Sequence, residues 1–303
     1  IYYVLNLKMI NPIKRHLSDG GRKRFFLLIV TLLSGGYSEA QSVGDVLLKV
    51  DYENGALDSG VTGINVTNAT AADAVYRVQP GATGNYAVAH KVVYGDPGYY
   101  SNDNWRSESA TNQLQAGRFW PGDERRYEFS VLLKDWTPWK VGDPTNETNI
   151  FQLKISGGAG VPLQIRTQRN VMRLRFAVDN NIPPLDIIPD VRLYVNQWIH
   201  FRIDVKWADT ATGYMKTYMK LPNQSNYIMV DDKTNYTTYN KGSVGGDHGY
   251  IKWGVYVTPP DITRIVYHDD IKIIYLGGPA VPSFEQKPEG VIYARKVHSS
   301  RYK

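Results

Sequence analysis

The chain has 303 residues, 35 Lys and Arg against 29 Asp and Glu, a formal net charge of +6, and no cysteine, which excludes disulfide and thiolate chemistry. Tyrosine, glycine and proline are abundant, and the apolar runs are short and rich in Val, Ile, Phe and Tyr. This composition predicts an all-β protein, with strands joined by turns.

The first 40 residues are typical of a leader with a secretory signal peptide. A basic segment from Lys14 to Arg24 precedes the apolar run 25-FFLLIVTLLSGG-36, and 38-SEA-40 fits a signal-peptidase site. The run is too short to span a bilayer as a helix, so we expect a secreted protein, extracellular or periplasmic, without a membrane span. The alternative is a buried core segment. The leader holds six of the basic and two of the acidic residues, which leaves 29 basic and 27 acidic residues, so any attraction for an anion must come from local charge placement.

Strand-like segments separated by turn clusters follow in the rest of the chain. They are 46-VLLKVDY-52, 86-YAVAHKVVY-94, 125-RRYEFSVLL-133, 149-NIFQLKI-155, 162-PLQIRTQ-168, 172-MRLRFAV-178, 198-WIHFRIDVKW-207, 213-GYMKTYMKL-221, 250-YIKWGVYV-257 and 265-IVYHDDIKII-274. With no helical pattern between them, they predict a β-sandwich of the jelly-roll type. We expect one monomeric domain over 41–278, followed by a basic tail over 279–303 whose composition favours disorder.

Several of these strands alternate a polar, often cationic row with an apolar one. The polar rows are Gln152 and Lys154; Gln164, Arg166 and Gln168; Arg173 and Arg175; Lys216, Tyr218 and Lys220; and Lys252 with Tyr256. They contain almost no acid, so neighbouring strands would form a basic, concave groove suited to a polymer with recurring carboxylates. The predicted substrate-binding residues are Lys154, Gln164, Arg166, Arg175, Tyr218 and Lys252. The alternative is a set of independent solvated faces.

The segment 250-YIKWGVYV-257 carries the most informative pattern. Alternation sends Lys252 and Tyr256 to one face and Trp253, Val255 and Val257 to the other. The segment resembles the Tyr-Phe-Lys-Ala-Gly-Val/Ile-Tyr motif of jelly-roll alginate lyases. In the same chain order, 106-RSES-109 resembles their Arg-Ser/Thr-Glu-Leu-Arg motif and 152-QLK-154 their Gln-Ile/Val-His motif. The variant 252-KWGVY-256 is more similar to secreted glucuronan lyases and the heparin-lyase-I-like group; the resemblance covers about residues 45–275.

The resemblance implies a polysaccharide lyase that cleaves a uronic-acid polymer by β-elimination, with glucuronan favoured and alginate second. Removal of the C5 proton places charge on the sugar carboxylate, so a lyase must neutralise that group. Arg106 and Gln152 match the family's neutralising positions. The alternatives are a structural pair of Arg106 with Glu108 or another acid, and ordinary sheet-face polarity for Gln152. Tyr256 matches the catalytic tyrosine, which gives a proton to the leaving O4 and can also remove the C5 proton.

Two positions depart from the alginate lyase motifs. Lys154 replaces the histidine, and Ala110 replaces the final arginine. A lysine with an ordinary pKa near 10.4 is a poor base at neutral pH. His90, on an earlier strand, is therefore the predicted base by resemblance to glucuronan lyases, and His200 is the second choice. The alternative for His90 is a half-buried strand histidine without a catalytic role.

A structural Ca²⁺ is a further expectation, with no cofactor required for catalysis. Glu53 in 51-DYENG-55 and Asp270 in 269-DD-270 lie near the two ends of the domain, where early and late strands of many secreted jelly rolls meet around calcium. The alternative is two solvated turn acids.

Other functions compete with the lyase interpretation. No zinc-ligand spacing, phosphate-binding loop or serine nucleophile motif occurs. The basic groove and the resemblance imply an anionic polysaccharide as the partner, and no nucleic acid is expected. A glycoside hydrolase would need two carboxylates in the groove, whereas a carbohydrate-binding module could share the fold and the aromatic residues.

Overall fold

The structure, a computed structural model, describes residues 41–145, 147–157, 160–176, 182–240 and 247–279. The predicted leader and nearly all of the predicted basic tail lie outside these residues. Helical structure in the described part consists of three short 3₁₀ helices, η1 (Pro97–Tyr99), η2 (Gln115–Gly117) and η3 (Val191–Tyr194). A search of the same residues for an apolar helix long enough to cross a membrane finds none.

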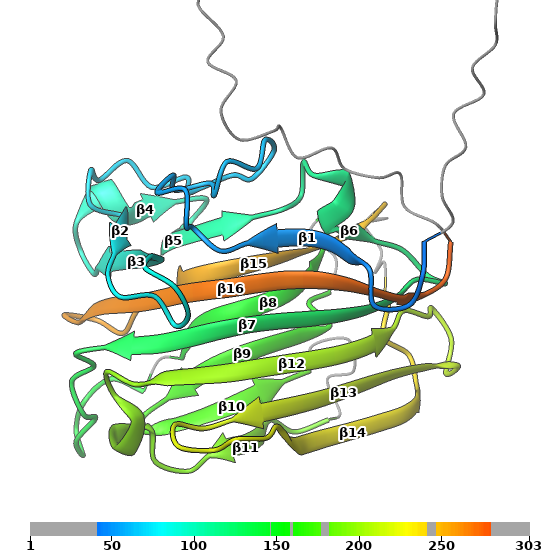
Figure 1. Ribbon diagram of the computed structural model, residues 1–303. Coiled ribbons are helices and arrows are strands. Elements are labelled where there is room, and N and C mark those ends of the chain that lie inside the picture. The colour runs from blue at the N-terminus through cyan, green and yellow to red at the C-terminus, as the bar shows by residue number, and fades with distance from the viewer. Residues whose placement is uncertain (1–40, 146, 158–159, 177–181, 241–246, 280–303) are drawn as a thin grey trace, which may run out of the picture. The chain divides into compact units, whose positions relative to one another are not determined.

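Two antiparallel sheets form the domain, one in front of the other in Figure 1. Sheet A has the order β14 (Ile228–Tyr236), β13 (Gly213–Lys220), β12 (Trp198–Lys206), β7 (Glu124–Lys134), β16 (Thr263–Gly277), β3 (Ala87–Val93) and β2 (Val75–Val78), with β1 (Val46–Val50) paired to β16. Sheet B has the order β11 (Leu185–Ile188), β10 (Val171–Arg175), β9 (Leu163–Gln168), β8 (Thr148–Ile155), β15 (Gly249–Tyr256), β5 (Asn104–Ala110) and β4 (Tyr100–Ser101), with β6 (Arg118–Phe119) paired to β15. The all-β sandwich prediction is confirmed.

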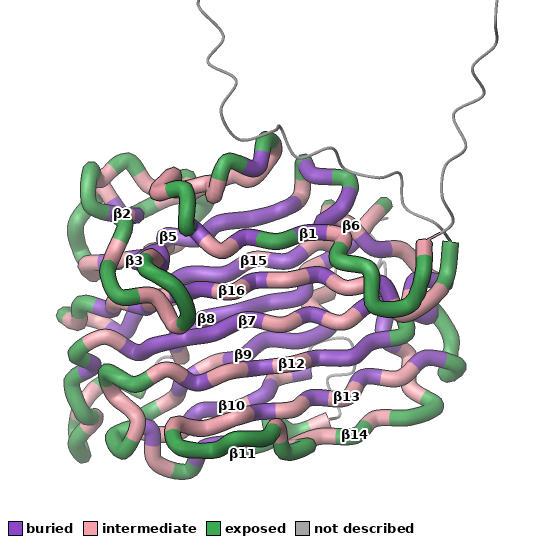
Figure 2. The backbone as a smooth tube through the Cα atoms, in the orientation of Figure 1, coloured by how far each residue is buried: buried purple, intermediate pink, exposed green. Residues whose placement is uncertain are grey.

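The core lies between the sheets and follows the period-two pattern of the strands. Figure 2 shows buried and less buried residues alternating along β13, where Met215 and Met219 point inward. Phe129 of sheet A stacks on Phe151 of sheet B at 3.8 Å between ring centroids. The buried Trp253 donates its indole N–H to the hydroxyl of Tyr52 at 2.9 Å, so its polar atom is satisfied inside the core.

Six strands were not expected from the sequence: β2, β4, β5, β6, β11 and β14. In β5, the positions that face the core are Ser107 and Ser109, whose hydroxyls donate to the carbonyls of Ala74 (2.6 Å) and Val66 (2.8 Å). Because these hydroxyls are satisfied by backbone acceptors, β5 is buried without the apolar alternation that normally identifies a strand.

Candidate functional site

A cavity of about 370 Å³ opens on the outer face of sheet B. It is lined by Arg106, Gln152, Lys154, Val161, Gln164, Arg166, Arg175, Lys252, Tyr256 and Val257. Eight of these ten residues are ones that the sequence assigned to catalysis or substrate binding, and the expectation that they share one surface is confirmed. We call this cavity the cleft.

Strand register brings these residues together from five strands. One row across the sheet pairs Arg106 with Tyr256. A second row pairs Lys252 with Gln152, Gln152 with Gln164 and Gln164 with Arg175. Directly paired residues on one face of an antiparallel sheet lie about 4.5–5.5 Å apart, so residues distant in sequence meet within the length of one or two sugar units.

The close approach of β15 and β5 depends on Gly254. Its φ is +138°, and a Cβ at this position would lie 2.2 Å from the carbonyl oxygen of Ser107 and 2.7 Å from the Cα of Glu108. No other residue fits there without moving β5. Gly254 thus allows Lys252 and Tyr256 to face the cleft while Trp253 and Val255 are buried, as the alternation predicts.

Tyr256 lies directly beside Arg106. The guanidinium carbon of Arg106 is 4.4 Å from the centroid of the Tyr256 ring, which is a cation–π contact. Nη2 of Arg106 donates to the carbonyl of Asn102 at 2.8 Å, and Nη1 lies 3.9 Å from the Glu108 carboxylate. The guanidinium is therefore held by one strong hydrogen bond and one long ion pair, which leaves N–H donors directed at the cleft.

Glu108, which the sequence suggests only as a structural partner of Arg106, makes closer contacts with two other cleft residues. It is 5% exposed and lies beneath the cleft, where its Oε1 accepts a 2.7 Å hydrogen bond from Nε2 of Gln152. Its Oε2 accepts from the Lys252 ammonium. One buried carboxylate thus fixes the orientation of the Gln152 amide and compensates a cleft cation. Glu108 is two residues after Arg106 on one strand, so the alternation of β5 could have placed both on the same face.

The other cleft cations differ in how they are compensated. Arg166 forms an ion pair with Glu147, and Arg175 donates to Oε1 of Gln164 at 3.1 Å. Lys154 forms no ion pair with any described residue. Burial, followed by the charge of Lys252, lowers the pKa of Lys154 from its ordinary value, which increases the fraction of neutral amine.

The cleft lining contains five cationic side chains and no carboxylate among the described residues. Its only neutral polar groups are two glutamine amides and one phenol. This composition favours an anionic ligand, because N–H donors outnumber acceptors in the described lining and the nearby acids Glu108 and Glu147 are paired with Lys252 and Arg166.

Three expectations about individual residues are wrong. His90 does not line the cleft: it is fully buried between the sheets, and its Nε2 is 2.9 Å from Oγ of Ser109. Tyr218 lies on β13 of sheet A, where it pairs with Arg202, so the groove on sheet B cannot include it. Val257 lines the cleft instead of the core, because its φ of +62° ends the regular alternation of β15.

The second-choice base, His200, also lies on sheet A. It is on β12, where its Nδ1 is 2.8 Å from Oγ of Ser130. The structure thus brings no described histidine into the lining of the cleft.

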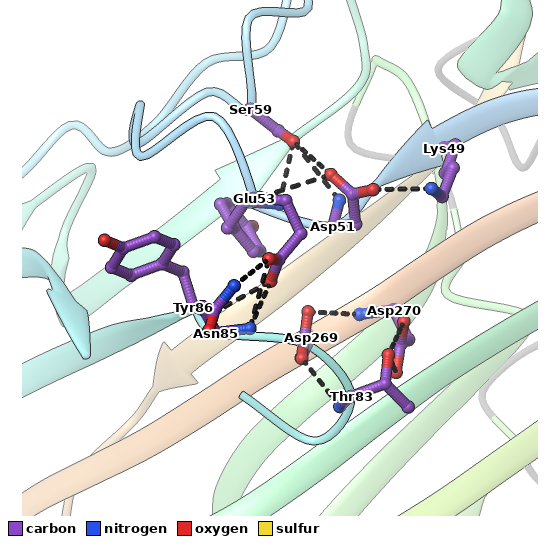
Figure 3. A network of polar contacts seen from close by, with 10 residues as sticks. Lys49, Asp51, Glu53, Ser59, Thr83, Asn85, Tyr86, Asp269 and Asp270 are labelled. Carbon is purple, nitrogen blue, oxygen red and sulfur yellow. Dashed lines mark hydrogen bonds and ion pairs between the residues drawn. The ribbon is translucent and has the colours of Figure 1, made fainter. Parts of the chain in front are cut away.

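The two predicted calcium ligands lie where the early and late strands meet, as expected: Val50 of β1 pairs with Ile271 of β16. Figure 3 shows the surrounding network. The Glu53 carboxylate accepts backbone N–H bonds from Asn85 and Tyr86, both at 2.9 Å, which lower its pKa. The Asp270 carboxylate accepts from the hydroxyl of Thr83 at 2.8 Å. Protein donors therefore occupy both carboxylates, and the described residues contain no group of three or more His, Cys, Asp or Glu side chains that could hold a metal ion.

Comparison with known proteins supports the resemblance. A family model described as polysaccharide lyase matches residues 52–272. Among solved structures, the endo-β-1,4-glucuronan lyase from the fungus Trichoderma reesei is 17% identical, with a TM-score of 0.53, over 76% of this chain and 96% of that chain. A marine alginate lyase from Aplysia kurodai is 8% identical, with a TM-score of 0.51, over 76% and 99%.

The alginate lyase Aly36B is 11% identical, with a TM-score of 0.50, over 79% of this chain and 100% of that chain. At these identities the likeness to solved structures shows the fold alone. No curated protein matches the sequence.

Proposed function

The chain belongs to the polysaccharide lyase family, and from this premise we propose that it cleaves a uronate polymer by β-elimination in the cleft on sheet B. Glucuronan is the proposed substrate and alginate the second candidate, because 252-KWGVY-256 is closer to the glucuronan lyase variant of the motif and Lys154 replaces the histidine of the alginate lyase motif. The observation that carries the proposal is the cleft itself, where a guanidinium, an amide and a phenol face one basic cavity whose described lining contains no carboxylate.

The first requirement of the reaction is to neutralise the sugar carboxylate. As the C5–H bond breaks, its electron pair delocalises into that carboxylate, so N–H donors that already surround it stabilise the transition state. Arg106 offers the guanidinium donors left beside its bond to Asn102. Gln152 offers the second N–H of an amide whose first N–H is held by Glu108. Because Glu108 fixes this amide, the donor is in place before the substrate binds.

Tyr256 is the proposed proton donor to the leaving group. When the C5 proton is removed, the bond from C4 to the glycosidic oxygen breaks, a C4–C5 double bond forms, and the phenol protonates the departing oxygen. The products are a new chain end and an unsaturated uronate. The Arg106 guanidinium over the Tyr256 ring faces the negative charge that the ring carries after it has given up its proton.

Two cleft groups are candidates for the base: Tyr256 itself and Lys154. Burial lowers the pKa of Lys154, which brings it closer to the range of a general base than a surface lysine. Lys154→Arg separates them, because arginine keeps the charge but does not accept a proton. Activity near the wild-type level in this variant assigns both proton transfers to Tyr256, whereas a large loss with retained polymer binding assigns the base to Lys154.

The same cleft disfavours a glycoside hydrolase, whereas only a measurement of turnover distinguishes a lyase from a binding module. A glycoside hydrolase needs two carboxyl groups about 5–10 Å apart at the scissile bond, and the described lining contains none. A binding module needs no phenol positioned beside a guanidinium, although nothing prevents it from having one.

One incubation separates the three functions. The protein is incubated with glucuronan, alginate and heparin, and the absorbance of unsaturated uronate is followed together with reducing ends. A lyase increases both, a hydrolase increases reducing ends alone, and a binding module changes neither. Absence of unsaturated product from all three polymers would contradict the uronate proposal.

Secretion and a structural Ca²⁺ stay predictions. Secretion rests on the pattern of residues 1–40. Calcium would need oxygen ligands besides Glu53 and Asp270, whose carboxylates accept hydrogen bonds from Tyr86 and Thr83. A rise in melting temperature on adding Ca²⁺, reversed by chelation, would support the site.

A further inference from the structure

A second, smaller cavity lies on the outer face of sheet A, away from the cleft strands. Its volume is about 200 Å³, and its polar lining includes Glu128 and Ser130 of β7, His200 of β12, Lys220 of β13, Lys272 of β16 and Tyr227, which precedes β14. We call it the sheet A pocket. It is below the roughly 300–1,000 Å³ of pockets for drug-sized ligands, so its size suits one sugar unit.

Strand register explains why these side chains converge. Lys220 pairs with His200 and His200 with Ser130, which forms one row across β13, β12 and β7. Glu128 pairs with Lys272 in the next row. Except for Tyr227 and Thr83, which lie outside the strands, these side chains belong to paired strands, so the fold fixes their spacing.

The charged groups of this pocket do not neutralise one another through ion pairs. Neither Lys220 nor Lys272 forms an ion pair with a described residue, and the Glu128 carboxylate accepts no hydrogen bond from one. Glu128 pairs in register with Arg202, but that guanidinium bonds to Asp204. Two ammonium groups and one carboxylate thus remain available to a ligand around one hollow.

These groups match the chemistry of a uronate sugar. The ammonium groups of Lys220 and Lys272 suit its single carboxylate, and Glu128 and His200 suit its hydroxyls, which both donate and accept hydrogen bonds. The Lys220 ammonium lies 5.6 Å from the centroid of the Tyr227 ring, a cation–π contact that holds this cation at the pocket. A densely charged anion such as phosphate fits less well, because Glu128 and Asp270 also line the pocket and repel it.

We propose that the sheet A pocket binds one uronate unit of a polysaccharide, as a second binding site on the opposite sheet from the cleft. The choice of uronate rests on the proposed lyase function, whereas the existence of the pocket does not. A polymer held at both sites dissociates more slowly than one held at the cleft alone, because release of one segment leaves the other bound.

The test counts binding sites with turnover blocked. Short oligosaccharides of glucuronan, and in parallel of alginate, are titrated into the Tyr256→Phe variant by calorimetry and NMR. We expect two sites per chain. Adding Lys220→Met and Lys272→Met should remove one site and leave the other, whereas the matched control Lys206→Met, an exposed lysine on the same face of β12, should keep both.

Either of two results overturns the proposal: one site in the Tyr256→Phe variant, or two sites that persist after both lysines of the pocket are replaced. Circular dichroism and melting temperature show whether the double replacement has kept its fold, and the more conservative Glu128→Gln variant, which should weaken the same site severalfold, gives an independent measurement. The lyase proposal fails separately, by absence of unsaturated product from the wild-type protein, so the two failures are distinguishable.

Discussion

Each outer face of the sandwich carries an arginine stacked on a tyrosine: Arg106 on Tyr256 at 4.4 Å in sheet B, and Arg202 on Tyr218 at 4.7 Å in sheet A. Each arginine also has an acid two residues further along its own strand. In sheet A, Asp204 accepts hydrogen bonds from Arg202 through both Nε and Nη2, and it also accepts from Arg126 of β7 at 2.8 and 3.1 Å. In sheet B, Glu108 is engaged by Gln152 and Lys252, and it stays 3.9 Å from Arg106.

The difference shows why only one of the two similar Arg–Tyr pairs belongs to a candidate site. Arg202 bonds to the acid of its own strand through two nitrogens, although Arg126 of β7 shares that acid. Arg106 stays 3.9 Å from the acid of its own strand, which leaves N–H donors for a ligand. Sheet A therefore holds a structural Arg–Tyr pair. The pair in sheet B lines a cavity together with four other cationic side chains, those of Lys154, Arg166, Arg175 and Lys252. This comparison predicts unequal effects for equivalent substitutions on the two faces.

The largest effect is expected from removing the Tyr256 hydroxyl. Tyr256→Phe deletes the proposed proton donor and keeps the ring that stacks on Arg106, so turnover should fall by about 10²–10⁴-fold, the usual contribution of general acid–base catalysis. Polymer affinity should change little. Tyr218→Phe is the matched control and should retain wild-type turnover. Equal activity of the two variants, measured as unsaturated uronate formed per enzyme, would remove the distinction between the faces.

The next effect concerns the two guanidinium groups. Arg106→Ala removes a donor to the developing carboxylate charge and should reduce kcat by about 10²–10³-fold, as loss of one oxyanion donor does. Arg202→Ala should leave kcat unchanged and affect stability alone. Steady-state kinetics with thermal melting measure both quantities for each variant. A loss of kcat in Arg202→Ala comparable to that in Arg106→Ala would show that sheet A contributes to the chemistry.

A smaller effect should follow from neutralising the acids. Glu108→Gln keeps the volume but weakens the bonds that hold Gln152 and Lys252. Hydrogen bonds to charged groups contribute about 1.5–3 kcal/mol, so kcat/KM should fall by about ten- to a hundredfold. Asp204→Asn is the matched control: it should lower the melting temperature without lowering kcat/KM. If Glu108 has a structural role alone, its variant will show the same pattern as Asp204→Asn.

The sequence predicted the composition of the cleft better than its chemistry. Alternation correctly placed Gln152, Lys252 and Tyr256 on outward faces, because each of their strands has an apolar inner row. Tyr218 has the same alternation, but alternation assigns a residue to a face and not to a sheet. Strand order depends on contacts between segments far apart in the chain, and these are invisible in one sequence.

Glu108 and His90 show the second limit. The role of Glu108 depends on the register that places it beside Gln152, and β5 has no apolar period that would have identified it as a strand. His90 was placed near the cleft because its strand precedes β5, but β3 lies in the opposite sheet and presents the imidazole to the interior. The order of strands along the chain therefore does not indicate in which of the two sheets the strand of His90 lies.

The smallest effect is expected from replacing one of two histidines that are buried between the sheets. His90 and His268 are fully buried, with ring centroids 5.8 Å apart, and Nε2 of His268 is 2.9 Å from the carbonyl oxygen of Ile150. Burial lowers the pKa of His90 to about 3 and that of His268 well below its ordinary value. Both rings are therefore neutral in the folded protein over the physiological range.

This pair should make the sandwich sensitive to acid. Above pH 6.5 the histidines are neutral whether the chain is folded or unfolded, so they cause no pH dependence; below it the unfolded chain gains protons that the folded state resists, and stability falls. At pH 5 the loss is about 2 kcal/mol for each histidine. His90→Asn should therefore lose about 2 kcal/mol less than wild type between pH 7.5 and pH 5 in urea unfolding, whereas the half-buried His200→Asn should differ less. An identical decrease in His90→Asn and wild type would mean that water reaches the interior and that the two faces are joined less tightly than the structure indicates.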